Sequence, residues 1–115
     1  MASTESEEHP YYPTFREAYR IGESSLILDT TKLEGPAHGI VPWNPAYKVG
    51  DKITFELFQI TPWISSIFVT EENREKEFVF PIEKEKFDFT PSRFWCYLND
   101  GPFPVPPINL HVILE

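Results

Sequence analysis

Apolar and polar residues alternate along much of this chain with the two-residue period of a β-strand. The clearest example is residues 52–60, where polar residues separate Ile53, Phe55 and Leu57. The alternation slips at Phe58, which a β-bulge or burial on both faces would explain. This segment is the strongest predicted strand of the chain.

Other segments with the same pattern recur between turn-forming and charged stretches. They are residues 24–33, 63–70, 77–82, 87–90, 93–99 and 108–115. Together with residues 52–60 they predict an all-β fold, an antiparallel two-sheet β-sandwich of about seven strands, Ig-like in the broad sense. Pro81 lacks the N–H that a central strand needs, so residues 77–82 are expected at a sheet edge.

One short segment, residues 13–21, favours a helix instead. Pro13 suits the first helical position, and Phe15 and Tyr19 would share a face. Gly22 would end the element, so the sequence predicts one short N-terminal helical turn.

The predicted domain organisation is simple. A chain of 115 residues has the size of one domain. Residues 1–12 are expected to be a flexible acidic arm, and residues 13–115 a single β-sandwich domain. Residues 35–47 carry three prolines and two glycines and predict a long loop.

The charge of the chain narrows the range of partners. The formal net charge is −8, with 18 acidic residues against 10 basic ones. Proteins that bind nucleic acid or anionic membranes generally need a basic surface. Neither nucleic acid nor membrane is therefore an expected partner.

Cysteine usage and the chain's N-terminal residues bear on location. Cys96 is the single cysteine, so no disulfide can form within the chain. The first ten residues are polar and acidic, unlike a signal peptide, and no apolar run approaches a membrane span. These features predict a cytoplasmic protein.

Residues that could ligate a metal or act as nucleophiles are few. A copper site of the cupredoxin type needs a histidine close after the cysteine, but His111 follows Cys96 by fifteen positions. His38 with Cys96 could form a catalytic dyad only if the fold joined them. The sequence therefore predicts no metal site, no cofactor and no catalytic residues.

Paired carboxylates for acid–base chemistry are equally unsupported. The candidates occupy outward strand positions or turns, where solvation explains them. They are Asp29, Glu56, Asp88 and Asp100.

Aromatic residues beside prolines and turns are the most informative feature. Rigid aromatic faces with amide or carboxylate groups nearby can stack on sugar rings or anchor protein partners. The predicted ligand-binding residues are Trp95, Tyr97, Asn99, Asp100, Trp43, Asn44 and Tyr47. Two alternatives remain open: these aromatics complete the core, or they are buried in a homo-oligomer.

Three functions follow in order of preference. The first is a non-enzymatic binding protein, with a carbohydrate ligand bound in the manner of a lectin. The second is a protein–protein interaction module, such as a protease inhibitor or an assembly subunit, that uses the proline-rich segments 36–47 or 99–107. The third is a small enzyme that uses His38, His111 or Cys96.

Overall fold

The computed structural model describes residues 12–22, 24–99, 101 and 107–114, and over these the chain is all-β. The nine strands found there are β1 (Thr14–Phe15), β2 (Tyr19–Gly22), β3 (Ser25–Asp29), β4 (Ala37–Val41), β5 (Lys52–Phe58), β6 (Trp63–Phe68), β7 (Phe78–Ile82), β8 (Ser92–Leu98) and β9 (Ile108–Ile113). Two 3₁₀ helices, η1 (Thr30–Lys32) and η2 (Lys84–Lys86), complete the elements. No helix within the described residues has the length and apolar character to cross a bilayer.

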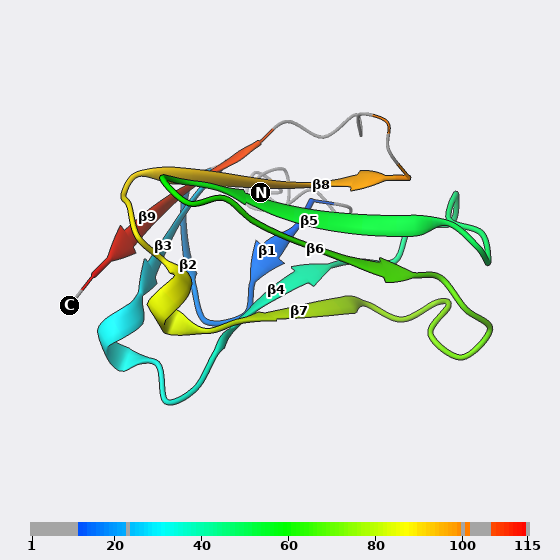
Figure 1. Ribbon diagram of the computed structural model, residues 1–115, viewed down its shortest axis with the longest axis horizontal. Coiled ribbons are helices and arrows are strands. Elements are labelled where there is room, and N and C mark those ends of the chain that lie inside the picture. The colour runs from blue at the N-terminus through cyan, green and yellow to red at the C-terminus, as the bar shows by residue number, and fades with distance from the viewer. Residues whose placement is uncertain (1–11, 23, 100, 102–106, 115) are drawn as a thin grey trace, which may run out of the picture.

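The strands form two sheets (Figure 1). The small sheet has the order β1-β4-β7 and the large sheet the order β2-β3-β9-β8-β5-β6. Neighbouring strands are antiparallel except β3 and β9, which run parallel. The prediction of a wholly antiparallel arrangement is therefore wrong for this pair. A parallel pair needs a long crossover, which most of the chain supplies here because β3 and β9 lie near its two ends.

Phe55 marks the centre of a core that both sheets contribute to. It lies on β5 of the large sheet and stacks on Phe80 of β7 in the small sheet, with ring centroids 5.5 Å apart. Phe94 stacks on it at 5.5 Å, and Phe15 of β1 meets it edge-on at 5.6 Å. Apolar side chains at every second position of β5, β8 and β9 point to this side and are buried. The alternation in the sequence therefore predicts the core-facing side of these three strands correctly.

Gly39 on β4 allows the two sheets to approach closely at Phe55. A Cβ atom at position 39 would lie 2.8 Å from the Phe55 ring, closer than real Cβ contacts. Glycine is thus required here by packing, because its missing side chain leaves the space that the ring fills.

The predicted N-terminal helical turn is wrong. Residues 14–15 pair with β4, and the N–H of Ala18 donates to the Phe15 carbonyl at 3.2 Å to close a turn before β2. One isolated helical turn is barely stable in water. The strand arrangement instead buries Phe15 against Phe55 and Phe94, which outweighs the local helical signal.

The strand count also differs from the predicted seven. β1 and β2 replace the predicted helix, and β4 runs through the predicted loop at 35–47. Residues 87–90 form no strand, because the N–H of Asp88 donates to the Gln59 side chain at 3.1 Å rather than to a neighbouring strand. The prolines and glycines in and around β4 hid a strand in which four of the five residues are buried.

Strand β7 confirms the prediction drawn from Pro81. It is the last strand of the small sheet, and the Pro81 side chain is exposed. Of the predicted acidic arm, residues 1–11 lie outside the described residues, and Tyr12 packs against the core.

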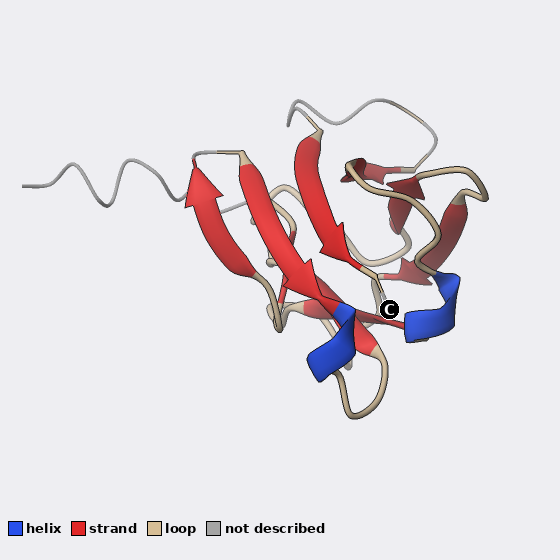
Figure 2. Cartoon of the chain, turned by 90° about the vertical axis from the view of Figure 1, so that its left-hand side faces the viewer, coloured by secondary structure: helices blue, strands red, loops and turns tan. Residues whose placement is uncertain are grey.

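The turns that line the candidate site lie at one end of the molecule. The turn after β5, helix η2 and the segment leading into β8 lie together there, with η1 and the end of β9 beside them (Figure 1). Figure 2 looks onto this end and shows both 3₁₀ helices on it. We call it the η2 end.

Candidate functional site

Three aromatic side chains, Phe58, Trp95 and Tyr97, form a row on the outer face of the large sheet, which we call the aromatic shelf. Trp95 and Tyr97 alternate on β8 with the buried residues Phe94 and Cys96, so they point away from the core. The Trp95 ring meets Phe58 edge-on at 5.0 Å and Tyr97 edge-on at 6.4 Å. The structure therefore brings these two predicted residues together.

A hydrogen bond from the neighbouring strand fixes the orientation of Trp95. Glu56 on β5 lies directly across from Trp95, and the indole Nε1–H donates to Glu56 Oε1 at 3.1 Å. The ring is half-buried, with one edge held by Phe58 and the nitrogen held by the carboxylate. The indole N–H is thus already hydrogen-bonded, and only the apolar surface of the ring remains for a ligand.

A hollow adjoins the shelf at the η2 end, and we call it the Phe89 hollow. Its volume is about 340 Å³. It is lined by Phe58, Gln59, Ile60, Phe89, Pro91, Ser92 and Arg93. Phe58 belongs to both the shelf and the hollow, so the two features form one continuous apolar surface.

Large apolar side chains are exposed to solvent around the Phe89 hollow. Phe89 is 46% exposed and Ile60 is 69% exposed, although both are large apolar residues. Arg93 is exposed at the rim and forms no ion pair with any residue in the described part of the chain. The slipped alternation at Phe58 and Ile60 was the sequence signal for this site, but the residues are exposed rather than covered on both faces.

The second predicted group of aromatics lies elsewhere, in a core-side cluster of Trp43, Tyr47 and Phe78. Trp43 meets Tyr47 edge-on at 5.6 Å and lies over Phe78 at 6.2 Å. Tyr47 is buried, and burial together with the nearby Cys96 thiol raises the pKa of its hydroxyl. Because Cys96 lies on the core-facing side of β8, this cluster is on the opposite side of that strand from Trp95. The structure therefore does not bring Trp43 and Tyr47 together with Trp95.

The predicted polar ligand residues are used to stabilise turns. Asn44 Oδ1 accepts from the N–H of Ala46 at 2.9 Å, which is an Asx turn. Asn99 adopts a positive φ of 55°, and its Oδ1 accepts from the Lys52 N–H at 3.0 Å where β8 ends. Asp100 lies outside the described residues. Asn44 and Asn99 therefore have structural roles in these turns.

A second hollow at the η2 end contains the third tryptophan, and we call it the Trp63 hollow. Its volume is about 250 Å³, and it is lined by Thr61, Pro62, Trp63, Glu85, Lys86 and Asp88. Asp88 Oδ2 accepts from the Thr61 N–H at 2.9 Å. Its other oxygen, Oδ1, is buried and accepts no hydrogen bond from the described residues. A half-buried indole with polar groups around it distinguishes this hollow from the Phe89 hollow.

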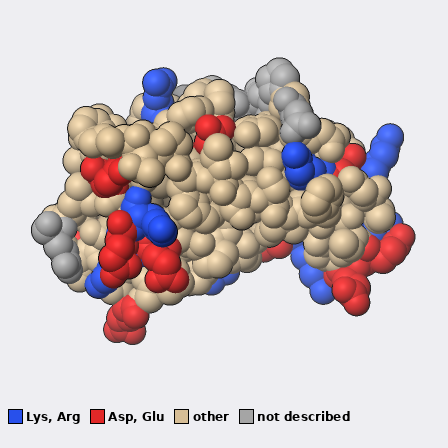
Figure 3. Space-filling model, viewed as in Figure 1, with Lys and Arg blue, Asp and Glu red and all other residues tan. Residues whose placement is uncertain are grey.

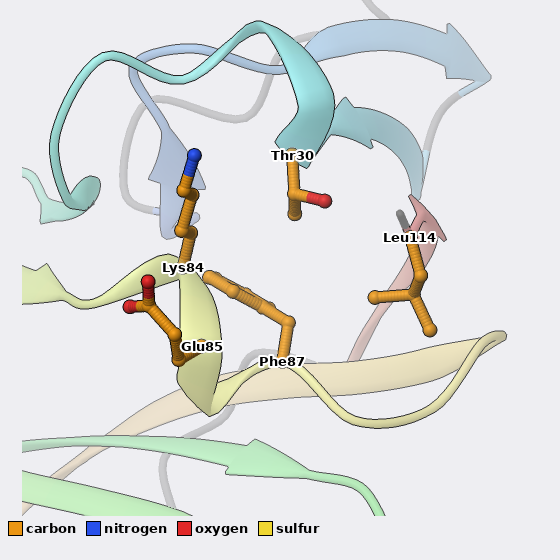
Figure 4. Close-up of a pocket in the computed structure, with 5 residues that line it drawn as sticks. All are labelled: Thr30, Lys84, Glu85, Phe87 and Leu114. Carbon is orange, nitrogen blue, oxygen red and sulfur yellow. The ribbon is translucent and has the colours of Figure 1, made fainter.

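A third hollow of about 280 Å³ lies between η1 and η2 and is shown in Figure 4. The Lys84 and Glu85 side chains come from η2, while Thr30 and Leu114 approach from the other side. The Thr30 hydroxyl donates to the Ile113 carbonyl at 2.6 Å, so this group ties η1 to the end of β9.

His38, His111 and Cys96 have separate environments and form no evident catalytic group. Burial raises the pKa of Cys96 to about 12, which leaves the thiol protonated and unreactive near neutral pH. His38 Nδ1 lies 2.5 Å from Glu17 Oε2, and its backbone N–H donates to Glu17 Oε1 at 2.9 Å. His111 is exposed on β9. Within the described ranges, no group of three or more His, Cys, Asp or Glu residues could hold a metal ion.

The three predicted carboxylates that the structure describes are likewise separate. Asp29 caps η1 through the Thr31 N–H and hydroxyl, Glu56 binds the Trp95 indole, and Asp88 binds the Thr61 N–H. Each carboxylate has its own local partner, so none of them is paired with another for acid–base catalysis.

Comparison with family models, with curated proteins and with solved structures finds no match for this chain. The functional argument therefore depends on the geometry of the shelf and the hollows.

Proposed function

We propose that this protein is a non-enzymatic recognition module that binds a segment of another protein in the Phe89 hollow. The observation that carries this proposal is the exposure of Phe89, Ile60 and Phe58 around one concavity that continues into the aromatic shelf. Soluble proteins rarely leave contiguous large apolar side chains in contact with water unless a partner covers them. We also propose that the two sheets form an Ig-like β-sandwich in the broad sense, in a cytoplasmic protein.

The chemistry of the hollow suggests the kind of segment that fits. Aromatic and arginine residues are the side chains that most often dominate protein interfaces. Phe58 and Phe89 would hold an apolar side chain, and the guanidinium of Arg93, which forms no ion pair with another described residue, would bind a carboxylate next to it. The expected ligand is therefore a peptide segment with an apolar residue and an acidic residue close together.

Selection from a random peptide library with the full chain as target tests this proposal. Selected peptides should be rich in apolar residues beside Asp or Glu. Replacing Phe89→Ala should weaken their binding at least tenfold, which is about 1.4 kcal/mol. The matched control is Phe68→Ala on β6, which is 58% exposed but lies outside the hollow and should bind normally. Equal losses from both variants, or from neither, would contradict the assignment.

Carbohydrate binding remains a second candidate because of the Trp63 hollow. An indole face beside carboxylate, hydroxyl and ammonium groups suits a sugar ring, and Asp88 Oδ1 still lacks a donor within the described residues. Asp88→Asn keeps an oxygen for the Thr61 N–H but changes the group at Oδ1. If the wild type binds a glycan on an array, Asp88→Asn should change that binding, while Asp29→Asn at η1 should not. A wild type that binds no glycan would end this candidate.

A further inference from the structure

The free edge of β6 is the best unassigned interaction surface in the described part of the molecule. Each sheet has two edge strands, which are β1 and β7 in the small sheet and β2 and β6 in the large one. Edge strands offer unpaired backbone groups to other strands, so natural proteins usually protect them. The four edge strands differ in how far they are protected.

Three of these edges carry such protection. β1 is two residues long, and β7 contains Pro81, which has no N–H to donate. β2 has four residues, includes Arg20, and has a register irregularity before Gly22. Short length, proline, charge and a bulge are the usual ways of blocking a new strand pair.

Strand β6 has none of these features. It is six residues long, with the sequence WISSIF, and contains no charged residue, proline or glycine. Its pairing with β5 is regular over its whole length. Figure 3 shows that charged side chains gather towards the two ends of the face viewed in Figure 1, and leave few charges on the band between them. In that view, β6 runs lengthwise between the charged ends.

The hydrogen-bond pattern identifies which backbone groups of β6 point away from β5. The Val69 N–H donates to the Asp51 carbonyl at 2.8 Å, directly after the last pair of the β5–β6 ladder. Antiparallel pairs alternate between bonded and non-bonded, so Phe68, Ser66 and Ile64 direct their backbone groups away from β5. The Asn73 amide, which donates to the Phe68 carbonyl at 2.9 Å, agrees with this direction.

The exposed side chains of β6 suit a second copy of the same strand. Ile64 and Phe68 lie on the outer face with Ser66 between them, and Ile64 is 55% exposed. Two antiparallel copies of this apolar–Ser–apolar pattern would bring apolar side chains together on the outer face, and the Ile64 and Ser66 backbones would supply the hydrogen bonds.

We propose that two copies of this protein pair through the free edges of β6, which joins their large sheets into one continuous antiparallel sheet. Six residues of strand edge make a small contact, so the dimer is weak and transient. The Phe89 hollow lies at the η2 end, and none of the residues that line it belongs to β6.

Sedimentation of the full chain tests the proposal. Between roughly 10 μM and 1 mM, the weight-average mass should rise from 13.4 kDa towards twice that value. Ile64→Lys puts a charge on the β6 edge and should raise the dimer dissociation constant at least about tenfold. Ile60→Lys is the matched control, because Ile60 is 69% exposed but lies in the turn after β5. This control should dimerise normally.

Backbone amide exchange supplies a second readout that is specific for the strand. The Ile64 and Ser66 amides should become more protected as the wild-type concentration rises, and should show no such change in Ile64→Lys. A wild type that stays monomeric to 1 mM would overturn the proposal and leave β6 to a strand from another protein. An Ile64→Lys dimer as tight as the wild type would overturn it as well. Peptide binding separates this proposal from the proposed function, since Ile60→Lys should impair it and Ile64→Lys should not.

Discussion

Two groups of aromatic residues that look alike in the sequence have opposite roles in the molecule. Trp43 and Tyr47 sit among prolines and belong to the core-side cluster, where Phe78 packs against them. Trp95 and Tyr97 lie on the outer face of β8, where the aromatic shelf continues into the Phe89 hollow. The side of the sheet, rather than the residue type or a neighbouring proline, decides whether an aromatic stabilises the fold or is available to a partner.

The largest effect is expected from the centre of the core. Phe55→Ala removes a ring that contacts Phe15, Phe80 and Phe94, and leaves a cavity between the sheets. The free energy of unfolding should fall by about 3–5 kcal/mol, measured by urea denaturation. A loss under about 1 kcal/mol would mean that the two sheets do not meet at this ring.

The core-side cluster should show the next largest effect. Trp43→Ala deletes the contacts to Tyr47 and Phe78, so the unfolding free energy should fall by about 2–3 kcal/mol. Peptides selected on the Phe89 hollow should still bind the folded fraction of this variant. If instead Trp43→Ala removed binding without loss of stability, the two groups of aromatics would have the reverse of the roles assigned here.

Gly39 tests how closely the sheets approach. Gly39→Ala places a methyl group 2.8 Å from the Phe55 ring, and the ring has little room to move between Phe80 and Phe94. We expect a loss of about 1–3 kcal/mol by denaturation. Gly35→Ala is the control, since a Cβ there meets nothing within 4 Å.

Alkaline pH should weaken the core side of β8. The pKa of the Cys96 thiol rises from 9.0 to about 12 in the folded protein because the group is buried. The stabilisation is complete below pH 9, where the thiol is protonated in both states, and is lost as the pH rises towards 12 because only the unfolded chain ionises. Tyr47, whose pKa is raised too, adds to the loss.

Denaturation at a series of pH values measures this effect. The slope due to Cys96 should be at most about 1.4 kcal/mol per pH unit, and Cys96→Ala should have a shallower slope than the wild type. A wild-type thiol that reacts rapidly with an alkylating reagent at pH 8 in the folded protein would contradict the burial of Cys96.

The smallest change in stability is expected on the shelf. Trp95→Ala loses the bond to Glu56 and the contact with Phe58, but the ring is half-exposed. We expect a loss of about 1 kcal/mol in unfolding free energy, together with weaker peptide binding because Phe58 loses its support. A loss as large as that of Trp43→Ala would show that the shelf belongs to the core.

The sequence predicted the strands that alternate cleanly, and missed those decided by distant contacts. Residues 52–58 and 108–113 were recognised because every second residue is apolar and buried. β1 was missed because its two residues form a strand only through pairing with β4, which no local pattern records. β4 was missed because prolines and glycines flank it.

The candidate site was predicted in part for a similar reason. Alternation on β8 placed Trp95 and Tyr97 on the outer face correctly. The Phe89 hollow combines the turn after β5 with the segment before β8, which only the antiparallel pairing of these strands brings together. Asn44 and Asn99 are typical turn residues, and their side chains bind backbone N–H groups as such residues commonly do.

The central claim is that recognition occurs at the Phe89 hollow and the aromatic shelf. The most direct measurement is an NMR titration of the uniformly ¹⁵N-labelled full chain with a library-selected peptide. The account predicts that the largest shifts occur at the amides of residues 58–60, 89, 90, 92 and 93 and at the Trp95 indole N–H. Shifts concentrated instead at residues 43–47, or spread evenly over the molecule, would contradict it.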